Sequence, residues 1–221
     1  KQALKVNANS VDVYNNMGLA YQDMGELVLA KFVFQKALNA IPGADENAYL
    51  HLNLGWTYFQ QERVPAAVVE LQRALELDPL LVPALVNLSR IYMADRNYED
   101  TVPLLERAVE QAPGDVGVQM NLGIAYRGIE RFEDAERQYR KVLEMEPSNP
   151  EPWMNLGILF GDYTKDYEAS MDAFQSYIDT GGPRQAEAEE FHKLVKREKK
   201  RAEKRKKAEE DRKKREEDRA E

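Results

Sequence analysis

The chain has 221 residues, 31 of them Lys or Arg and 39 Asp or Glu, and its formal net charge is −8. It contains no cysteine, which excludes disulfides, thiolate metal sites and thiol nucleophiles. The longest apolar run, residues 80–86, contains Pro83 and falls far short of the ~18 to 20 residues that cross a membrane. The length is sufficient for one substantial domain.

The sequence repeats at an almost constant spacing. Small residues recur 37, 34, 34 and 34 positions apart, at Gly18, Gly55, Ser89, Gly123 and Gly157. An aromatic residue follows each of them three positions later, and a second small residue follows twelve or thirteen positions later. A proline closes each of the first four units, at Pro42, Pro79, Pro113 and Pro147. A fixed period of this length indicates that each unit buries its apolar face on its neighbours.

Each unit is predicted to be a pair of amphipathic helices. Apolar positions recur at intervals of three and four, as at Phe34, Ala37 and Leu38, and strand-like alternation is absent. Gly25 and Gly128 are expected to end first helices. We expect the small residue of the first helix to face the small residue of the second, with the aromatic side chain filling the space beside them.

The period divides the chain into consecutive segments. We predict repeat units at residues 11–47, 48–81, 82–115, 116–149 and 150–183. Residues 1–10 match the end of a unit, so we expect a truncated upstream repeat and, further upstream, any targeting signal. Extra residues around 43–47 and 161–166 are expected to lie in loops.

The end of the chain has a different composition. Residues 184–196 are predicted to form a capping helix, because Phe191, Leu194 and Val195 make one apolar stripe. Residues 197–221 are predicted to be a charged helical or disordered tail, in which pairs such as Glu209 and Lys213 stand four residues apart.

The repeated order of small residue, aromatic, alanine, aromatic, alanine and proline resembles the tetratricopeptide repeat, as does the run of residues 153–157, Trp-Met-Asn-Leu-Gly. The resemblance covers about 173 of the 221 residues. It implies an all-α fold, a right-handed solenoid of helix pairs whose first helices line a concave groove. Tyr177 replaces the final alanine of the fifth unit, which indicates altered packing at that end.

Motifs for chemistry are absent from the sequence. The only two histidines, His51 and His192, lack the spacing of a metal site, and His51 stands at a packing position. No nucleophile elbow, phosphate-binding glycine loop or dinucleotide motif occurs. We therefore expect no enzymatic activity, no catalytic residues, no metal, no cofactor and no small-molecule substrate.

A row of asparagines stands two residues before each of the five small residues, at Asn16, Asn53, Asn87, Asn121 and Asn155. By resemblance these amides line the groove. An amide offers a donor and an acceptor, so it can pair with both halves of a peptide unit in an extended chain. The alternative is that the amides bond neighbouring helices, and the sequence leaves both readings open.

Other residues on the first helices complete the expected partner site. Trp56 and Phe59 form an aromatic anchor, Ile124 adds apolar surface, and Arg90 and Arg127 are expected as isolated cations. Trp56 has a second reading, as a contact buried between the first and second units. The basic residues that clamp a terminal carboxylate in some family members are missing here, which disfavours that mode of recognition.

The function predicted from these features is a scaffold for protein–protein interaction that takes a partner segment in its groove. A competing hypothesis is that the basic run at residues 193–207 binds nucleic acid or an anionic membrane surface. Interleaved acids after Glu209 and the lack of aromatic residues there for base stacking disfavour nucleic acid.

A narrower resemblance concerns residues 162–168, residues 177–182 and the charged tail. Together they look like the tetratricopeptide lipoproteins of the myxobacterial adventurous gliding-motility machinery. This resemblance implies a periplasmic scaffold on the inner side of a bacterial outer membrane, held there only by an anchor upstream of the sequence. A cytoplasmic adaptor is the alternative.

Overall fold

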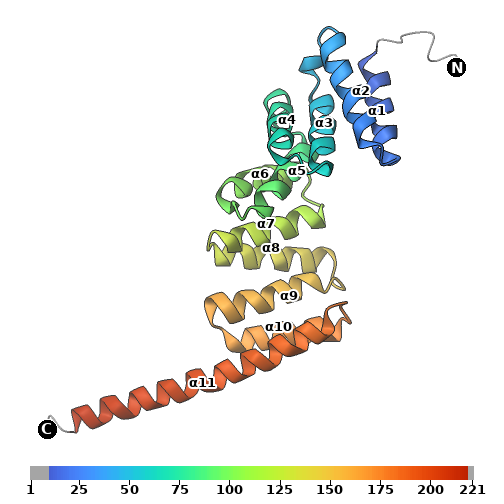
Figure 1. Ribbon diagram of the computed structural model, residues 1–221. Helices are drawn as coiled ribbons and strands as arrows, with labels where there is room; N and C mark the ends of the chain where they lie inside the picture. The colour runs from blue at the N-terminus through green and yellow to red at the C-terminus, as the bar shows by residue number, and fades with distance from the viewer. Residues whose placement is uncertain (1–9, 219–221) are drawn as a thin grey trace. The chain divides into compact units, whose positions relative to one another are not determined.

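The computed structural model describes residues 10–218, which are helical apart from short turns and contain no β-strand (Figure 1). The all-α prediction is confirmed. The segment expected to end an upstream repeat lies outside the described residues except for Ser10, as do the last three residues of the tail. The chain separates into two compact units between Val118 and Gln119, and each is considered by itself.

The first unit contains three helix pairs. They are α1 (Val11–Asp23) with α2 (Leu27–Ala40), α3 (Ala48–Gln60) with α4 (Val64–Leu77), and α5 (Val82–Ala94) with α6 (Tyr98–Gln111). Each pair is tied to the next by the same kind of hydrogen bond: Gln35 Nε2 donates to the Tyr58 hydroxyl over 2.8 Å, and Gln72 Nε2 donates to the Tyr92 hydroxyl over 3.1 Å. The repeated tyrosine therefore joins successive pairs.

The second unit contains most of α7 (Val116–Gly128) and all the helices that follow it. These are α8 (Phe132–Met145), α9 (Glu151–Ile158) with its continuation η3 (Leu159–Thr164), α10 (Tyr167–Asp179) and α11 (Gln185–Glu217). Each range predicted to form a repeat holds one helix pair.

The first helices pack closely on their partners because their glycines lie under large side chains. A Cβ on Gly18, Gly123 or Gly157 would come within 2.3, 2.5 and 2.6 Å of the rings of Phe34, Tyr139 and Phe174, respectively. The small residue was expected to face another small residue, and this is only partly right. Gly55 lies near the Ala67 carbonyl oxygen and the Gly157 carbonyl accepts from Ser170 Oγ, but the atoms nearest to Gly18 and Gly123 belong to rings. A glycine leaves a hollow, and the large side chain four residues beyond the small one fills it.

The two insertions adopt different structures. The first forms a short 3-10 helix, η2 (Ala44–Glu46), which buries Ala44 and leads into Asn47, whose side chain caps α3 by accepting from the Leu50 N–H. The second was expected in a loop, and that expectation is wrong. Its extra residue widens the end of the first helix into the π-helical turn η3, where hydrogen bonds span five residues instead of four.

The turn inside each pair contains one residue with left-handed backbone geometry. These residues are Gly25, Glu62, Arg96, Glu130 and Lys165, with φ between 57° and 76°. Only the first is a glycine. Gly128 is the last residue of α7, as expected, and Glu130 makes the turn.

The predicted capping helix and charged tail form one continuous helix, α11, within the described residues (Figure 1). Its first turns cover the end of the second unit, because Ala188 and Val195 pack against Met154, Phe174 and Tyr177. The rest of α11 runs on past α9 and α10, and its side chains beyond Ala202 are exposed.

Tyr177 explains the altered packing at this end. Its side chain is fully buried, and its hydroxyl accepts a hydrogen bond of 2.9 Å from the Arg184 backbone N–H. A Cβ on Gly182 would lie 2.4 Å from the Tyr177 ring, so the turn before α11 follows the ring closely. The large Tyr177 side chain thus determines how α11 begins and packs. Among the described residues, no helix combines the length and the apolar character needed to traverse a bilayer.

Candidate functional site

The first helices of the first unit form one continuous surface. Gln22 of α1 donates from Nε2 to the Asn53 carbonyl over 3.1 Å and to the Thr57 hydroxyl over 2.8 Å, both on α3. On the other side of α3, the Arg90 guanidinium of α5 lies 5.4 Å from the centre of the Trp56 ring. These contacts place α1, α3 and α5 side by side.

An aromatic cluster with an attached cation occupies the middle of this surface. The rings of Trp56 and Phe59 stack 5.3 Å apart at an interplanar angle of 29°. Both side chains are half-buried, whereas Arg90 is exposed. Arg90 was expected as an isolated cation, which is wrong, because the electron-rich face of the Trp56 ring attracts its guanidinium. Such a cluster offers apolar area and charge to a partner together.

The asparagine row behaves unevenly in the first unit. Asn53 Nδ2 donates to Asn15 Oδ1 over 2.7 Å, so this amide bonds the neighbouring helix, as one of the two readings holds. Asn16, the row position beside Asn15, is exposed. Asn87 is half-buried and makes no side-chain hydrogen bond to a described residue of its unit.

In the second unit, one asparagine of the row, Asn155, is hydrogen-bonded to an arginine. Asn155 Nδ2 donates to the Glu151 carbonyl over 3.0 Å, and Asn155 Oδ1 accepts from Arg127 over 3.3 Å. The Arg127 guanidinium also lies 5.9 Å from the centre of the Tyr163 ring in η3. Arg127 is therefore not isolated either, since it ties α7 to α9 and η3.

One member of the row and one apolar neighbour in the second unit remain accessible. Asn121 and Ile124, on α7, are half-buried, and Asn121 makes no side-chain hydrogen bond to a described residue of its own unit. Asn87 and Asn121, like the exposed Asn16, therefore have side-chain donors and acceptors that no described residue of their own unit uses.

His51 takes a packing role. It is 9% exposed, its Nδ1 lies 2.7 Å from Glu70 Oε2, and its Nε2 lies 3.1 Å from the Asp45 carbonyl oxygen. The ring therefore joins α3 to α4 and η2. Within residues 10–218, no group of three or more His, Asp or Glu side chains has the arrangement of a metal site.

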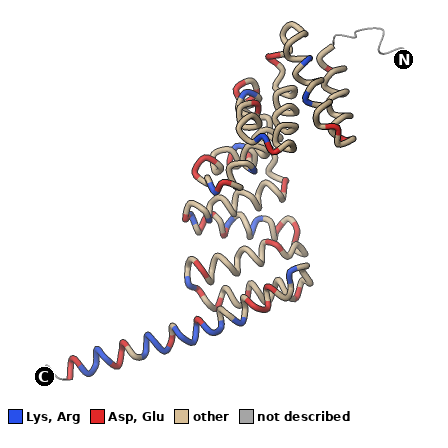
Figure 2. Tube along the Cα trace, in the orientation of Figure 1, with Lys and Arg blue, Asp and Glu red and all other residues tan. Residues whose placement is uncertain are grey.

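Ion pairs join α11 to its neighbours α9 and α10. Arg184 binds Glu187 with two hydrogen bonds of 2.7 Å and lies 3.7 Å from Glu151 of α9. The hydrogen bond raises the pKa of Arg184 and lowers the pKa of Glu187. A hydrogen bond to Glu168 of α10 likewise raises the pKa of Lys199. The charge of α11 continues to its far end, where Lys and Arg alternate with acids (Figure 2).

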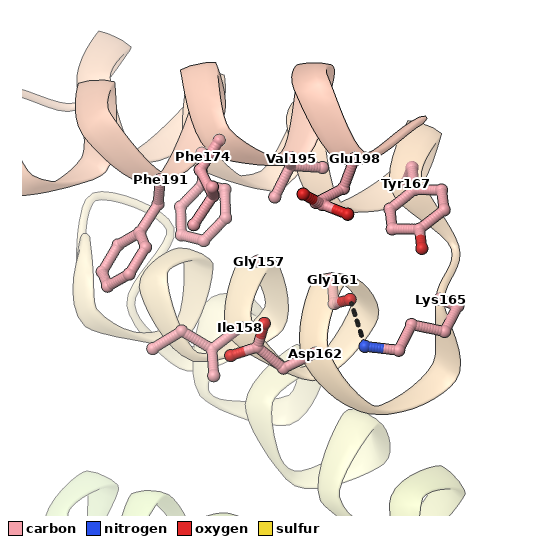
Figure 3. A pocket seen from close by; sticks show the side chains of 11 residues that line it. Gly157, Ile158, Gly161, Asp162, Lys165, Tyr167, Phe174, Phe191, Val195 and Glu198 are labelled. Atoms are coloured by element: carbon pink, nitrogen blue, oxygen red, sulfur yellow. Dashed lines mark hydrogen bonds between the residues drawn. The ribbon is translucent and has the colours of Figure 1, made fainter. Parts of the chain in front are cut away.

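A cavity of about 210 Å³ lies where η3, α10 and α11 meet (Figure 3). The rings of Phe174 and Phe191 stack beside it, with their centres 5.5 Å apart. Sequence reasoning missed this cavity. The available signals were the extra residue near Gly161 and the apolar stripe of α11, and only the fold brings them together.

Comparison with known proteins identifies the repeat. Three sequence profiles, each described as a tetratricopeptide repeat, match residues 9–79, 52–116 and 92–159. Together they span residues 9–159, which is more than half of the 221 residues. No curated protein sequence matches the chain significantly.

Solved structures share the fold. YrrB, described as a TPR protein with an unusual peptide-binding site, is 21% identical, with a TM-score of 0.75 over 90% of this chain and 96% of that one. MamA from Desulfovibrio magneticus RS-1 is 19% identical, with a TM-score of 0.70 over 77% of this chain and 94% of that one. MamA of MSR-1 is 19% identical, with a TM-score of 0.67 over 77% of this chain and 96% of that one.

Proposed function

We propose that this chain, which belongs to the tetratricopeptide repeat family, is a non-enzymatic scaffold that binds an extended segment of a partner protein along its first helices. The observation that carries the proposal is the continuous surface of α1, α3 and α5, with the cluster of Trp56, Phe59 and Arg90 at its centre. YrrB, which has the same fold and a peptide-binding site, adds support.

The surface offers two kinds of contact. Trp56 and Phe59 provide the apolar anchor, and aromatic residues of this kind dominate the energetics of many interfaces. Asn87 provides an amide that pairs with a backbone N–H and C=O irrespective of the partner's side chains. The partner is therefore held by one or two anchoring side chains and by its backbone, and no covalent bond is made or broken.

The test uses a peptide selected from a random library for binding to the full chain. We expect Trp56→Ala to weaken binding of that peptide by roughly 2 kcal/mol, about thirtyfold in Kd, because Trp56 is the central anchor. Tyr49→Ala is the matched control, since Tyr49 is an exposed aromatic residue at the start of the same helix. Equal peptide affinity in the parent and Trp56→Ala would contradict the proposed site.

A second candidate function rests on the far end of α11. The four consecutive basic residues 204–207 are exposed and form no ion pair with a described residue. They could bind an anionic membrane surface, each contributing ~1 kcal/mol. Binding of the full chain to phosphatidylserine vesicles that falls steeply with added salt, and is lost when residues 204–207 become Gln, would favour this function.

The finer proposal places the scaffold in a bacterial cell-envelope gliding-motility complex, with a cytoplasmic adaptor as the alternative. Its support is the resemblance of residues 162–168 and 177–182 to lipoproteins of that machinery. Fractionation of the native organism separates the two settings: recovery with outer-membrane fractions and loss of gliding on gene deletion would favour the first, and recovery with the cytosol would contradict it.

A further inference from the structure

The cavity at the end of the second unit has room for one large side chain. Its volume is about 210 Å³, whereas an apolar cavity of ~150 Å³ already holds a benzene-sized group. Phe174, Phe191, Ile158 and Val195 supply apolar walls (Figure 3). It lies between η3, which continues the first helix of the last pair, and the helices α10 and α11.

The backbone around the cavity is specialised. A Cβ on Gly161 would meet Ser170 Oγ at 2.8 Å and Val195 Cγ2 at 3.2 Å, so only glycine lets η3 approach α10 and α11 this closely. Ser170 Oγ in turn donates to the Gly157 carbonyl over 2.7 Å. The π-helical turn arises from the extra residue of this repeat, and π-bulges are frequent at functional sites.

The charges at the cavity favour a cation. Asp162 of η3 is exposed and has no ion pair with a described residue, and Glu198 of α11 projects from the opposite wall (Figure 3). Glu198 uses one oxygen to accept from Arg201 and keeps the other. The one basic residue lining the cavity, Lys165, points its amine 3.4 Å from the Gly161 carbonyl. Besides Arg201 on Glu198, one ammonium therefore lies near two carboxylates, of which Asp162 has no ion pair with a described residue and Glu198 keeps one oxygen for a ligand.

We propose that this cavity accepts an arginine side chain of the partner segment. This inference rests on the proposed function, because the arginine belongs to the chain that lies along the first helices. The methylenes of arginine would cover Ile158 and Phe191, and its planar guanidinium can stack on aromatic rings while pairing with Asp162 and Glu198. Lysine fits less well, because its ammonium is compact, strongly hydrated and neither planar nor bidentate.

The test needs no partner protein. The full chain is titrated with Nα-acetyl-arginine N-methylamide at low salt, and backbone amide NMR shifts are followed at Gly157, Gly161 and Phe191. Saturable shifts confined to this region are expected. Replacing both carboxylates, as Asp162→Gln and Glu198→Gln, should weaken binding of the probe about fivefold, since two exposed ion pairs contribute ~0.5 kcal/mol each.

Two further variants sharpen the result. The control Glu133→Gln with Glu144→Gln removes two exposed acids of α8 and should bind the probe as the parent does. Lys165→Gln removes the competing ammonium and should bind it more tightly.

Three outcomes would overturn the proposal: no localised shifts, a loss well below fivefold in the double variant, or equal affinity for Nα-acetyl-norleucine N-methylamide. The norleucine probe has no charge, so its equal binding would make the cavity an apolar anchor site. Peptide binding at Trp56, in the other unit, is measured separately and can succeed or fail without this result.

Discussion

Gly123 of α7 lies directly under the ring of Tyr139 of α8, and a Cβ on Gly123 would stand 2.5 Å from Tyr139 Cε1. Tyr139 is fully buried, so it has little room to move aside. Gly123→Leu is therefore expected to overpack the pair and to cost ~1 to 3 kcal/mol of unfolding free energy. Chemical denaturation gives the value, and an unchanged midpoint would contradict this packing. Gly114→Leu is the control, since nothing lies near its missing Cβ.

Tyr177 should contribute strongly to the stability of the contact between α10 and α11. Tyr177→Ala removes a fully buried ring and is expected to cost ~3 to 5 kcal/mol. Tyr177→Phe keeps the ring but loses the hydrogen bond from the Arg184 N–H, which is expected to lower the unfolding free energy by ~0.5 to 1.5 kcal/mol. Thermal unfolding of both variants checks the order, and a Phe variant as weak as the Ala variant would show that the hydrogen bond, not the ring, sets the stability.

Glu130→Gly should stabilise the second unit. Glu130 has φ of 61°, a left-handed geometry that costs a non-glycine residue ~1 to 2 kcal/mol, and the greater chain entropy of glycine offsets ~0.5 to 1 kcal/mol of that. A rise in Tm of a few degrees is expected. Gly25→Ala, at the corresponding turn of the first pair, should lower Tm. If both variants moved Tm in the same direction, backbone strain would not be the cause.

Acidification should loosen the start of α11. The pKa of Glu187 is lowered in the folded chain by the hydrogen bond from Arg184, so its contribution is present above the unfolded pKa of ~4.3 and is lost as pH falls through the lower folded value. Carbonyl ¹³C shifts of residues 185–188 should therefore lose helical character below about pH 4. Glu187→Gln should remove this pH response, and an identical titration in both proteins would refute the role.

The repeat and its helix pairs could be predicted because a fixed period and intervals of three and four leave few alternatives, as at Phe34 and Ala37. Details set by tertiary contacts could not. Gly18, Gly123 and Gly157 lie under rings and Gly55 under Leu71, because the hollow at each glycine is filled by the large side chain that the packing of the two helices brings there. The extra residue near Gly161 widened a helix instead of a loop, which local sequence does not decide.

The asparagine row shows the same limit at the site. Each asparagine stands two residues before a small residue, yet Asn53 bonds Asn15 and Asn155 accepts from Arg127, while Asn87 and Asn121 use neither donor nor acceptor within their units. The difference comes from neighbours that lie far away in the chain. Arg90 and Arg127 could not be recognised as ring-bound for the same reason.

The most direct test of backbone recognition by the asparagine row is the Kd of the selected peptide for the chain with both Asn87→Ala and Asn121→Ala. Two amide contacts are expected to be worth ~0.5 to 1.5 kcal/mol each, so the Kd should rise at least about fivefold while Tm stays unchanged. Asn39→Ala, an exposed amide of α2, serves as the control. An unchanged Kd together with a lowered Tm would mean that these amides only hold the helices together.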